Sequence, residues 1–308
     1  MIPGKAGKME KTVKRGREGM VESSSFAGHM ANVILGLVLL LIAFCSIVPM
    51  WHVLMASISE GRDLFAKDGL VLLPVGGLNF EGYKLVFSDP SILRSYAVTV
   101  FYVVGTAGLG LLLNVLGGYV LSQNSRLKPF FVAMLMFSMM FSGGLIPSYI
   151  VNSRLGLVGS PLAIIIPGCT NAMAVIMCMN AFLQVPRETV EAARMDGAGH
   201  LPLMFQVMLP QGKGLIMVTV INSALMAWNA WFEASIYLPR QRKWWPLQLL
   251  IRDLTAKNQD FLNYANPDYN RYLIQYVVIV IATLPVLLTF PFFQKRLEEN
   301  MVVGAVKG

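Results

Sequence analysis

The chain has 308 residues, of which 55% are hydrophobic and only 14% are charged. Soluble domains carry about a quarter charged residues, so this composition excludes an ordinary water-soluble protein and predicts one that needs a bilayer as solvent. The net charge of +8 does not indicate nucleic-acid binding, because the basic residues lie between apolar runs and form no single basic face.

The first segment, residues 1–30, is predicted to be a polar and basic tail. The apolar run that follows lasts about 25 residues, whereas the hydrophobic region of a signal peptide has about 7–15. We therefore expect a first transmembrane helix that is retained. A six-span membrane domain is predicted over residues 31–294, followed by a second tail over residues 295–308.

Six segments have the length and composition of membrane spans, since a helix needs about 20 mostly apolar residues to cross the bilayer core. The predicted fold class is therefore all-α, an integral membrane protein with six transmembrane helices. Gly143-Gly144 and Pro147 predict a break near one end of the third span, and Pro167 predicts a kink in the fourth. The six spans are expected at about 31–55, 97–121, 130–151, 161–183, 213–236 and 273–293.

The placement of Lys and Arg predicts the orientation of the spans. An even number of spans puts both termini on one side, and the basic first tail favours the cytoplasm for that side. The connection after the fifth span, about 237–271, is also basic and runs against the rule. Because the first helix usually dominates, we expect a multi-pass protein of the cell membrane, surrounded by lipid, with both termini cytoplasmic.

The polar segment between the fourth and fifth spans, about 184–212, has an architecture of its own. Pro186 suits the first turn of a helix, and Glu188 and Glu191 would complement the helix dipole. Gly197 is well placed for a left-handed C-cap. A second short helix is expected from about Pro202 to Met208, stopping at Leu209-Pro210. The whole predicts a helix–turn–helix on the cytoplasmic surface, with an amphipathic linker on lipid headgroups as the alternative.

The order and spacing of Glu191-Ala192-Ala193, Asp196-Gly197-Ala198 and Leu209-Pro210 resemble the EAA signature of ABC-importer permeases. The resemblance implies a type I ABC-importer permease fold. It also implies that the first short helix docks in a cleft of the ATPase, with Glu191 in contact and Gly197 making the sharp turn. The residues to which it assigns ATPase coupling are Glu191, Ala192, Ala193, Asp196, Gly197, Leu209 and Pro210.

The same resemblance implies the partners of this chain. They are a second permease subunit in a heterodimer, two ATP-binding subunits and an extracellular solute-binding protein. The closest likeness is to the carbohydrate-uptake class, in the branch for oligosaccharides such as aldouronate, and the ending Val303–Gly308 resembles tails that reach between ATPase subunits. Because the signature is shared across many importers, a permease for a non-sugar solute stays an alternative.

Several motifs that would indicate another function are missing from the sequence. There is no G-x-x-x-x-G-K-[ST] phosphate loop, no triad candidate and no histidine or cysteine at metal-ligand spacing. We therefore expect no enzymatic activity, no cofactor and no metal, with ATP hydrolysis on a separate subunit. Gly105, Gly108 and Gly110 are expected to serve close helix packing. The rival is a self-contained ion-coupled transporter, for which Glu233 is the only candidate relay.

The predicted solute path centres on the fifth span. Asn222 and Asn229 are seven residues apart, so they would share a helix face, and amides suit sugar hydroxyls. Trp228 and Trp231 offer rings for stacking, and Trp228-Asn229 resembles sugar permeases; Asn180 is a weaker candidate. The alternative is interhelical hydrogen bonding by the amides and an interfacial aromatic belt. The connection of about 237–271, with its cations and paired tryptophans, would anchor at headgroups or meet the solute-binding protein.

Overall fold

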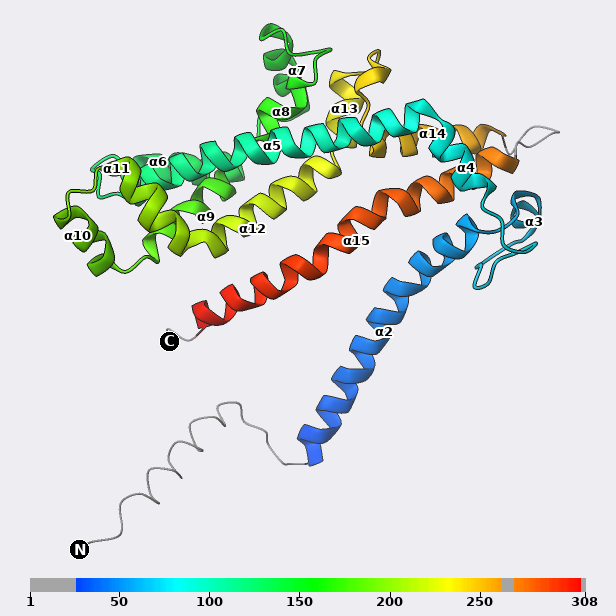
Figure 1. Cartoon of the computed structure of the whole chain (residues 1–308), viewed down its shortest axis with the longest axis horizontal. Helices are drawn as coiled ribbons and strands as arrows, with labels where there is room; N and C mark the ends of the chain where they lie inside the picture. The colour runs from blue at the N-terminus through cyan, green and yellow to red at the C-terminus, as the bar shows by residue number, and fades with distance from the viewer. Residues whose placement is uncertain (1–25, 262–268, 306–308) are drawn as a thin grey trace, which may run out of the picture. The chain divides into compact units, whose positions relative to one another are not determined.

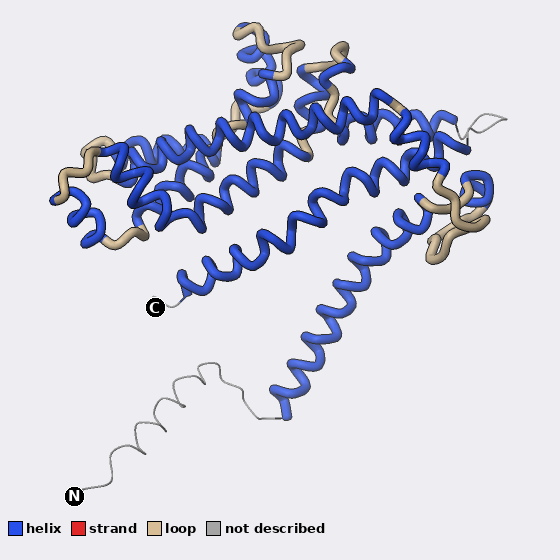
Figure 2. Tube along the Cα trace, in the orientation of Figure 1, coloured by secondary structure: helices blue, strands red, loops and turns tan. Residues whose placement is uncertain are grey.

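The computed structural model describes residues 26–261 and 269–305, and these residues form helices and loops without a strand (Figure 2). The predicted all-α class is therefore confirmed for the described part of the chain. The first tail, residues 1–25, lies outside the described residues. In chain order the elements are α2 (Phe26–Ser57), α3 (Gly61–Ala66), α4 (Glu81–Ser88), α5 (Pro90–Ser122), α6 (Lys128–Met140), α7 (Leu145–Arg154), α8 (Leu162–Gly168), α9 (Ala172–Leu183), α10 (Arg187–Met195), α11 (His200–Pro202), the π-helix η1 (Leu203–Met208), α12 (Leu209–Trp228), α13 (Trp231–Tyr237), the 3-10 helix η2 (Arg242–Trp244), α14 (Leu247–Phe261) and α15 (Tyr269–Ala305).

The chain divides into two compact units, Met1–His52 and Val53–Gly308. The described part of the first unit is most of α2, which has 32 residues and contains Pro49. Its sequence is apolar around the whole helix circumference, so it needs lipid or other apolar helices on every side. This helix covers the first predicted span.

Four helices among the described residues are long and apolar enough to cross a membrane, and the number rises to six if each of two bent pairs counts as one span. The six predicted spans correspond to these six in position. The last of them belongs to α15, which continues as helix to Ala305. The boundary expected at residue 295, between membrane domain and tail, therefore does not coincide with a helix end.

The third predicted span contains the expected break, and the bend there is sharp. Its two helices, α6 and α7, meet at an angle of 115° across residues 141–144, near the middle of the predicted segment. Gly144 adopts a φ of +84°, which lies in the left-handed region that favours glycine. The predicted break is therefore present, but it lies nearer the middle of the span than expected, because the glycine lets the backbone turn there.

The fourth predicted span is kinked, as Pro167 indicated. The helices α8 and α9 differ in direction by 43° across residues 169–171. Pro167 lies in the last turn of α8 and has no N–H to bond the preceding turn. Asn171 restarts the helix, because its Oδ1 accepts a hydrogen bond from the Ala174 N–H at 2.7 Å.

Three helices form the core of the second unit, since α5, α9 and α12 each pack against the other two (Figure 1). Small residues on α5 permit the close approach. A Cβ added at Gly118 would lie 2.5 Å from Cys178 Cβ, and one at Gly110 would collide with the Cys169 carbonyl oxygen. Of the three glycines expected to serve packing, Gly110 and Gly105 do so, whereas Gly108 faces open space.

The two ends of α5 carry different structures. Near the start of α5, Thr99 Oγ1 accepts a hydrogen bond from the Leu247 N–H at 2.8 Å, and Tyr102 Oη donates to the Trp244 carbonyl at 2.9 Å. The segment 237–261 is thus folded onto α5 as η2 and α14, where the sequence indicated only a long connection. At the far end of α5, Tyr119 lies beside His200, so α10 and α11 occupy the opposite end of the core (Figure 1).

Candidate functional site

The polar segment after α9 forms an exposed helix, α10, as predicted. Pro186 is its N-cap residue, with φ −56° and ψ 133°, and so precedes the first helical turn in which it was expected. Glu188 and Glu191 lie in the early turns and are exposed. Met195, at the end of the helix, is 88% exposed. The outer face of α10 is therefore exposed along its length.

Gly197 ends α10 in the conformation that the sequence predicted. Its φ is +83°, and its N–H donates to the Arg194 carbonyl at 3.0 Å. The next N–H, of Ala198, donates to the Ala193 carbonyl at 3.0 Å. These two bonds form a Schellman cap, which satisfies carbonyls that the helix end would leave free. The cap is confirmed as structure, whereas the assignment of Gly197 to coupling stays a prediction.

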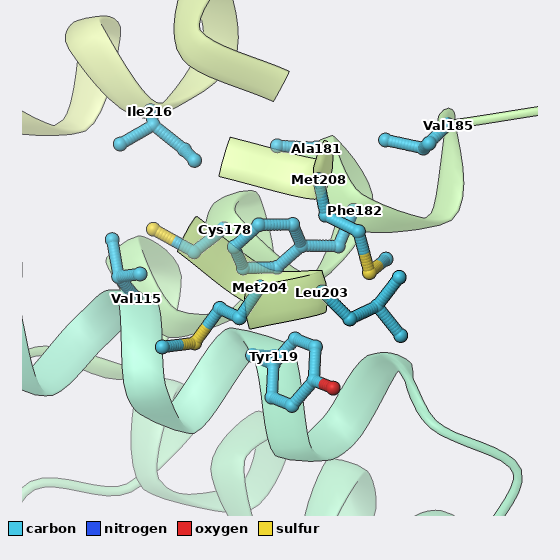
Figure 3. Packing of buried hydrophobic residues seen from close by; sticks show 10 residues of the cluster. All are labelled: Val115, Tyr119, Cys178, Ala181, Phe182, Val185, Leu203, Met204, Met208 and Ile216. Carbon is cyan, nitrogen blue, oxygen red and sulfur yellow. The ribbon is translucent and has the colours of Figure 1, made fainter. Parts of the chain in front are cut away.

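The inner side of α10 rests on an apolar cluster. Val190 and Ala193 pack against buried side chains drawn from α5, α9, η1 and α12. Figure 3 shows the cluster, in which the Phe182 ring lies among side chains of the neighbouring helices. Its members are Val115, Tyr119, Cys178, Ala181, Phe182, Val185, Leu203, Met204, Met208 and Ile216. The position of α10 is therefore fixed by packing, and Ala193, assigned to coupling, lies partly within this contact.

The second short helix does not stop at Leu209-Pro210 as expected. The elements α11, η1 and α12 form one continuous helical element, His200–Trp228. The turn before the proline is π-helical, and the Leu209 N–H bonds back to the Met204 carbonyl. Pro210 then falls in the first turn of α12. The wider turn changes the hydrogen-bond pattern ahead of the proline, which has no N–H to give, so the helix passes it without ending.

Polar contacts join this region to the end of α5. Arg194 Nη2 donates to Gln123 Oε1 at 2.9 Å, and the hydroxyl of Tyr119 lies 2.9 Å from His200 Nδ1. A cavity of 240 Å3 lies beneath α10, lined mainly by polar side chains. Glu191 lines it together with Arg187. The residue to which the sequence assigned ATPase contact therefore stands at the rim of a charged cavity.

The residues expected along the solute path lie on α9, on α12 and at the start of α13. Asn229 is the C-cap of α12; its N–H bonds the Leu225 carbonyl at 3.2 Å, and its Nδ2 donates to the same carbonyl at 2.9 Å. Asn222 and Asn180 are exposed on different helices. Trp228 is buried against Tyr96, with ring centroids 5.8 Å apart.

The fifth of these residues, Trp231, begins α13 and faces a cation. The Arg252 guanidinium lies 3.9 Å from the centroid of its ring. This contact joins α13 to α14 and gives the tryptophan a structural partner. The assignment of the five residues to a solute path stays a prediction.

A larger cavity, of 620 Å3, lies elsewhere in the second unit and is lined by α5, α7, α8, α12, α13 and the loop after α7. None of the five residues just described lines it. Its polar lining comes from Thr106, Ser148, Asn152, Glu233 and Tyr237. Sequence reasoning singled out Glu233 for another role and missed the other four. The sequence feature that could have located this cavity was the pair of predicted helix interruptions, since both α7 and α8 line the cavity.

The described residues contain no group of three or more His, Cys, Asp or Glu side chains that could hold a metal ion.

Comparison with known proteins indicates the family. Residues 118–303 match the model of the binding-protein-dependent transport system inner membrane component. The chain belongs to this family. The chain is thus a transmembrane permease component of an ABC importer and not an enzyme, and it lies in the cell membrane as a multi-pass protein. An ATPase and a solute-binding protein are the partners that this membership implies.

Several relatives cover nearly all of this permease. Protein LplC of Bacillus subtilis (strain 168) is 36% identical over 271 residues, which cover 85% of this chain and 90% of that one. The polygalacturonan/rhamnogalacturonan transport system permease protein YtcP of the same organism is 32% identical, with 88% and 96% covered. A crystal structure of a bacterial ABC transporter involved in the import of the acidic polysaccharide alginate superposes with a TM-score of 0.79. Its sequence is 28% identical, and 88% of this chain and 98% of that one are covered.

Proposed function

We propose that this permease subunit moves a saccharide or oligosaccharide into the cell, and that α10 receives the movement of the ATPase. The observation that carries the proposal is the construction of α10. It is a capped helix with an exposed outer face, held by packing and polar contacts at one end of the membrane helices. Glu191, Ala192, Ala193, Asp196 and Gly197 lie on it or in its cap.

The saccharide class is supported by what the relatives carry. YtcP is named for polygalacturonan and rhamnogalacturonan, and the similar solved transporter for alginate. A further relative, AraQ of Bacillus subtilis, is named for arabinooligosaccharides and is 25% identical over 282 residues. These solutes differ in charge, but all are chains of sugars, so the shared property is a path that accepts hydroxyl-rich rings.

The proposed mechanism is alternating access, without covalent chemistry in this chain. Closure of an ATPase dimer on ATP would displace α10. Because α10 is bonded to Gln123 and packs on the cluster of Figure 3, its displacement reaches α5, α9 and α12 together. These helices pack on one another, so they would move as a group and open the path to the other side of the membrane.

The assembly we propose is a heterodimer with a second permease on two ATP-binding subunits. Its support is the unpartnered surface of α6, on which no side chain is buried. Apolar side chains of this kind need lipid or another membrane helix beside them. We place α10 and both termini in the cytoplasm, which puts the segment containing η2 and α14 on the outer face, where a solute-binding protein would approach.

The test is gentle affinity purification of the tagged protein from its native membrane, followed by uptake measurements in reconstituted vesicles. We expect a second six-span permease and an ATPase to be recovered, and uptake to require ATP and the solute-binding protein. Glu191→Ala and Gly197→Pro should stop ATP-driven uptake while the protein still inserts. Uptake that persists in both variants would show that α10 does not take part in coupling. Uptake that instead collapses with an ion gradient and with Glu233→Gln would establish the ion-coupled carrier.

A further inference from the structure

The cavity of 620 Å3 is built where regular helix is interrupted. Its walls include α7, which leaves α6 at 115°, and α8, which precedes a 43° bend. Inside a membrane, irregular backbone is tolerated only where protein buries it or where it borders a water-filled space. Interrupted helices mark solute sites in other transporter folds for the same reason. The volume also lies within the range of about 300–1,000 Å3 that small-molecule sites have.

The cavity carries polar groups that the fold does not fully use. Thr106, in the middle of α5, is 3% exposed, and its Oγ1 has no hydrogen-bond partner within the described structure. A buried hydroxyl without a partner is energetically unfavourable, and a ligand hydroxyl could pair with it. A second polar lining residue, Asn152 of α7, is also buried, with 6% of its surface exposed.

Asn152 is held in place by two neighbours. Its Nδ2 donates to the Ser148 carbonyl at 3.0 Å and to the hydroxyl of Tyr237 at 3.2 Å. The Tyr237 ring is itself stacked on Tyr149, with centroids 6.1 Å apart and planes inclined by 10°. The amide is thus positioned before any ligand arrives, which lowers the entropic cost of binding.

The charge of the cavity lining bears on which solutes the cavity accepts. Among the described residues that line the cavity, Glu233, in the first turn of α13, is the only one with an acidic or basic side chain. The apolar part of the lining comes from residues such as Val151, Ile164 and Ala227. The carboxylate of an acidic solute would be repelled by Glu233, because no cation among the described residues lines the cavity beside it. The hydroxyls of a neutral solute could instead donate hydrogen bonds to Glu233.

We propose that this cavity is a saccharide site of this subunit itself, and that it favours a neutral sugar unit over a uronic acid. Asn152 and Tyr237 would hydrogen-bond the sugar hydroxyls, Thr106 would gain the partner it lacks, and Glu233 would both accept hydroxyls and exclude carboxylates. The inference rests on the proposed transport of saccharides and deepens it, since it names the site and the class of sugar unit.

The first experiment measures uptake by the complete importer, reconstituted with its ATPase and solute-binding protein, at limiting arabinotriose and at limiting trigalacturonate. The uptake by each variant is divided by the wild-type uptake of the same sugar, so that the selectivity of the solute-binding protein cancels. We expect Asn152→Ala to lower arabinotriose uptake about tenfold and Thr106→Val about threefold. Glu233→Gln should raise the trigalacturonate-to-arabinotriose ratio severalfold. Thr283→Val, an exposed threonine on α15 outside the cavity, is the matched control and should change neither uptake.

The second experiment does not depend on turnover. Ser148→Cys places a thiol in the cavity lining, in a protein whose exposed Cys45 is replaced by serine. Arabinotriose should slow labelling of this thiol by a maleimide severalfold, and trigalacturonate should not.

Three results would overturn the site. They are wild-type uptake in both Asn152→Ala and Thr106→Val, labelling that neither sugar slows, and loss of uptake confined to Asn222→Ala, which would return the path to the exposed face of α12. A Glu233→Gln variant with an unchanged sugar ratio would overturn the preference for neutral units. If the wild-type importer carries neither these two sugars nor any other in a panel of oligosaccharides, the proposed saccharide transport fails and the site fails with it.

Discussion

Arg194 on α10 donates a hydrogen bond to Gln123, the residue that follows α5, with 2.9 Å between Nη2 and Oε1. The two residues are 71 positions apart in the chain. The contact is exposed, so it adds little to stability, but it joins α10 directly to the end of α5, a membrane helix that runs the length of the core. Movement of α10 therefore has a polar route into α5 besides the continuous chain into α12.

Removal of this contact should weaken coupling more than folding. We expect Arg194→Ala and Gln123→Ala each to lower the amount of solute moved per ATP hydrolysed severalfold, with the melting temperature nearly unchanged. The double variant should be no worse than either single one, because both remove the same bond. Arg187→Ala is the comparison, since Arg187 lies on the same helix and borders the same cavity. An equal loss in Arg187→Ala would mean that charge matters and the bond does not.

Gly197 should tolerate asparagine better than alanine, and alanine better than proline. Its φ of +83° costs an ordinary L-residue about 1–2 kcal/mol, although no atom lies within 4 Å of a Cβ there. Asparagine enters this region more readily, whereas proline cannot adopt it and removes the N–H that bonds the Arg194 carbonyl. ATP-driven uptake and thermal stability of the three variants should follow that order. Equal uptake in Gly197→Pro and the wild type would show that the cap is dispensable.

Two glycines on α5 provide a test of helix packing with a control built in. Gly118→Ala should destabilise the protein by about 1–3 kcal/mol, because the added carbon would lie 2.5 Å from Cys178 Cβ and 2.7 Å from the Met179 nitrogen. Gly108→Ala, on the same helix, meets nothing within 4 Å and should be neutral or slightly stabilising. Thermal unfolding of the two purified variants decides the matter, and indistinguishable curves would contradict the packing of α5 on α9.

The pair Trp231 and Arg252 should stabilise the junction of α13 and α14. Because the guanidinium lies 3.9 Å from the ring centroid, we expect Arg252→Ala to cost about 0.5–1 kcal/mol. Arg240→Ala removes a nearby exposed cation that has no ring partner among the described contacts, and it should leave the unfolding curve in place. A similar loss in both variants would point to net charge as the cause.

The sequence predicted the helices better than their interruptions. Hydrophobic length located the spans, and the chemistry of Gly197 predicted the cap of α10, because both depend on local residues alone. The break at Gly144 was predicted but its angle was not, and the passage of the helix through Pro210 was not predicted. The passage depends on the π turn before Pro210, which the local residues do not reveal.

The candidate site divides in the same way. The segment that forms α10 could be recognised from the sequence, because its residues are consecutive and polar between apolar neighbours. The cavity was not visible, since Thr106, Asn152 and Glu233 come from three helices that only tertiary packing brings together. Asn222 and Trp228 were predicted to line the solute path because they are polar or aromatic residues in an apolar span. Their surroundings, an exposed helix face and a buried ring contact, could not be read from spacing.

The helical element that begins at His200 beside α10 ends at Trp228, and Met226 and Ala227 in its last turn line the large cavity. Its 29 residues make a rod about 43 Å long, at a rise of about 1.5 Å per residue. A lever of that length turns a tilt of about 5° at its base into a shift of about 4 Å at its tip. That shift is wider than a hydroxyl group. In the proposed mechanism, a small movement of the ATPase at the α10 end would therefore become a larger displacement of the cavity wall.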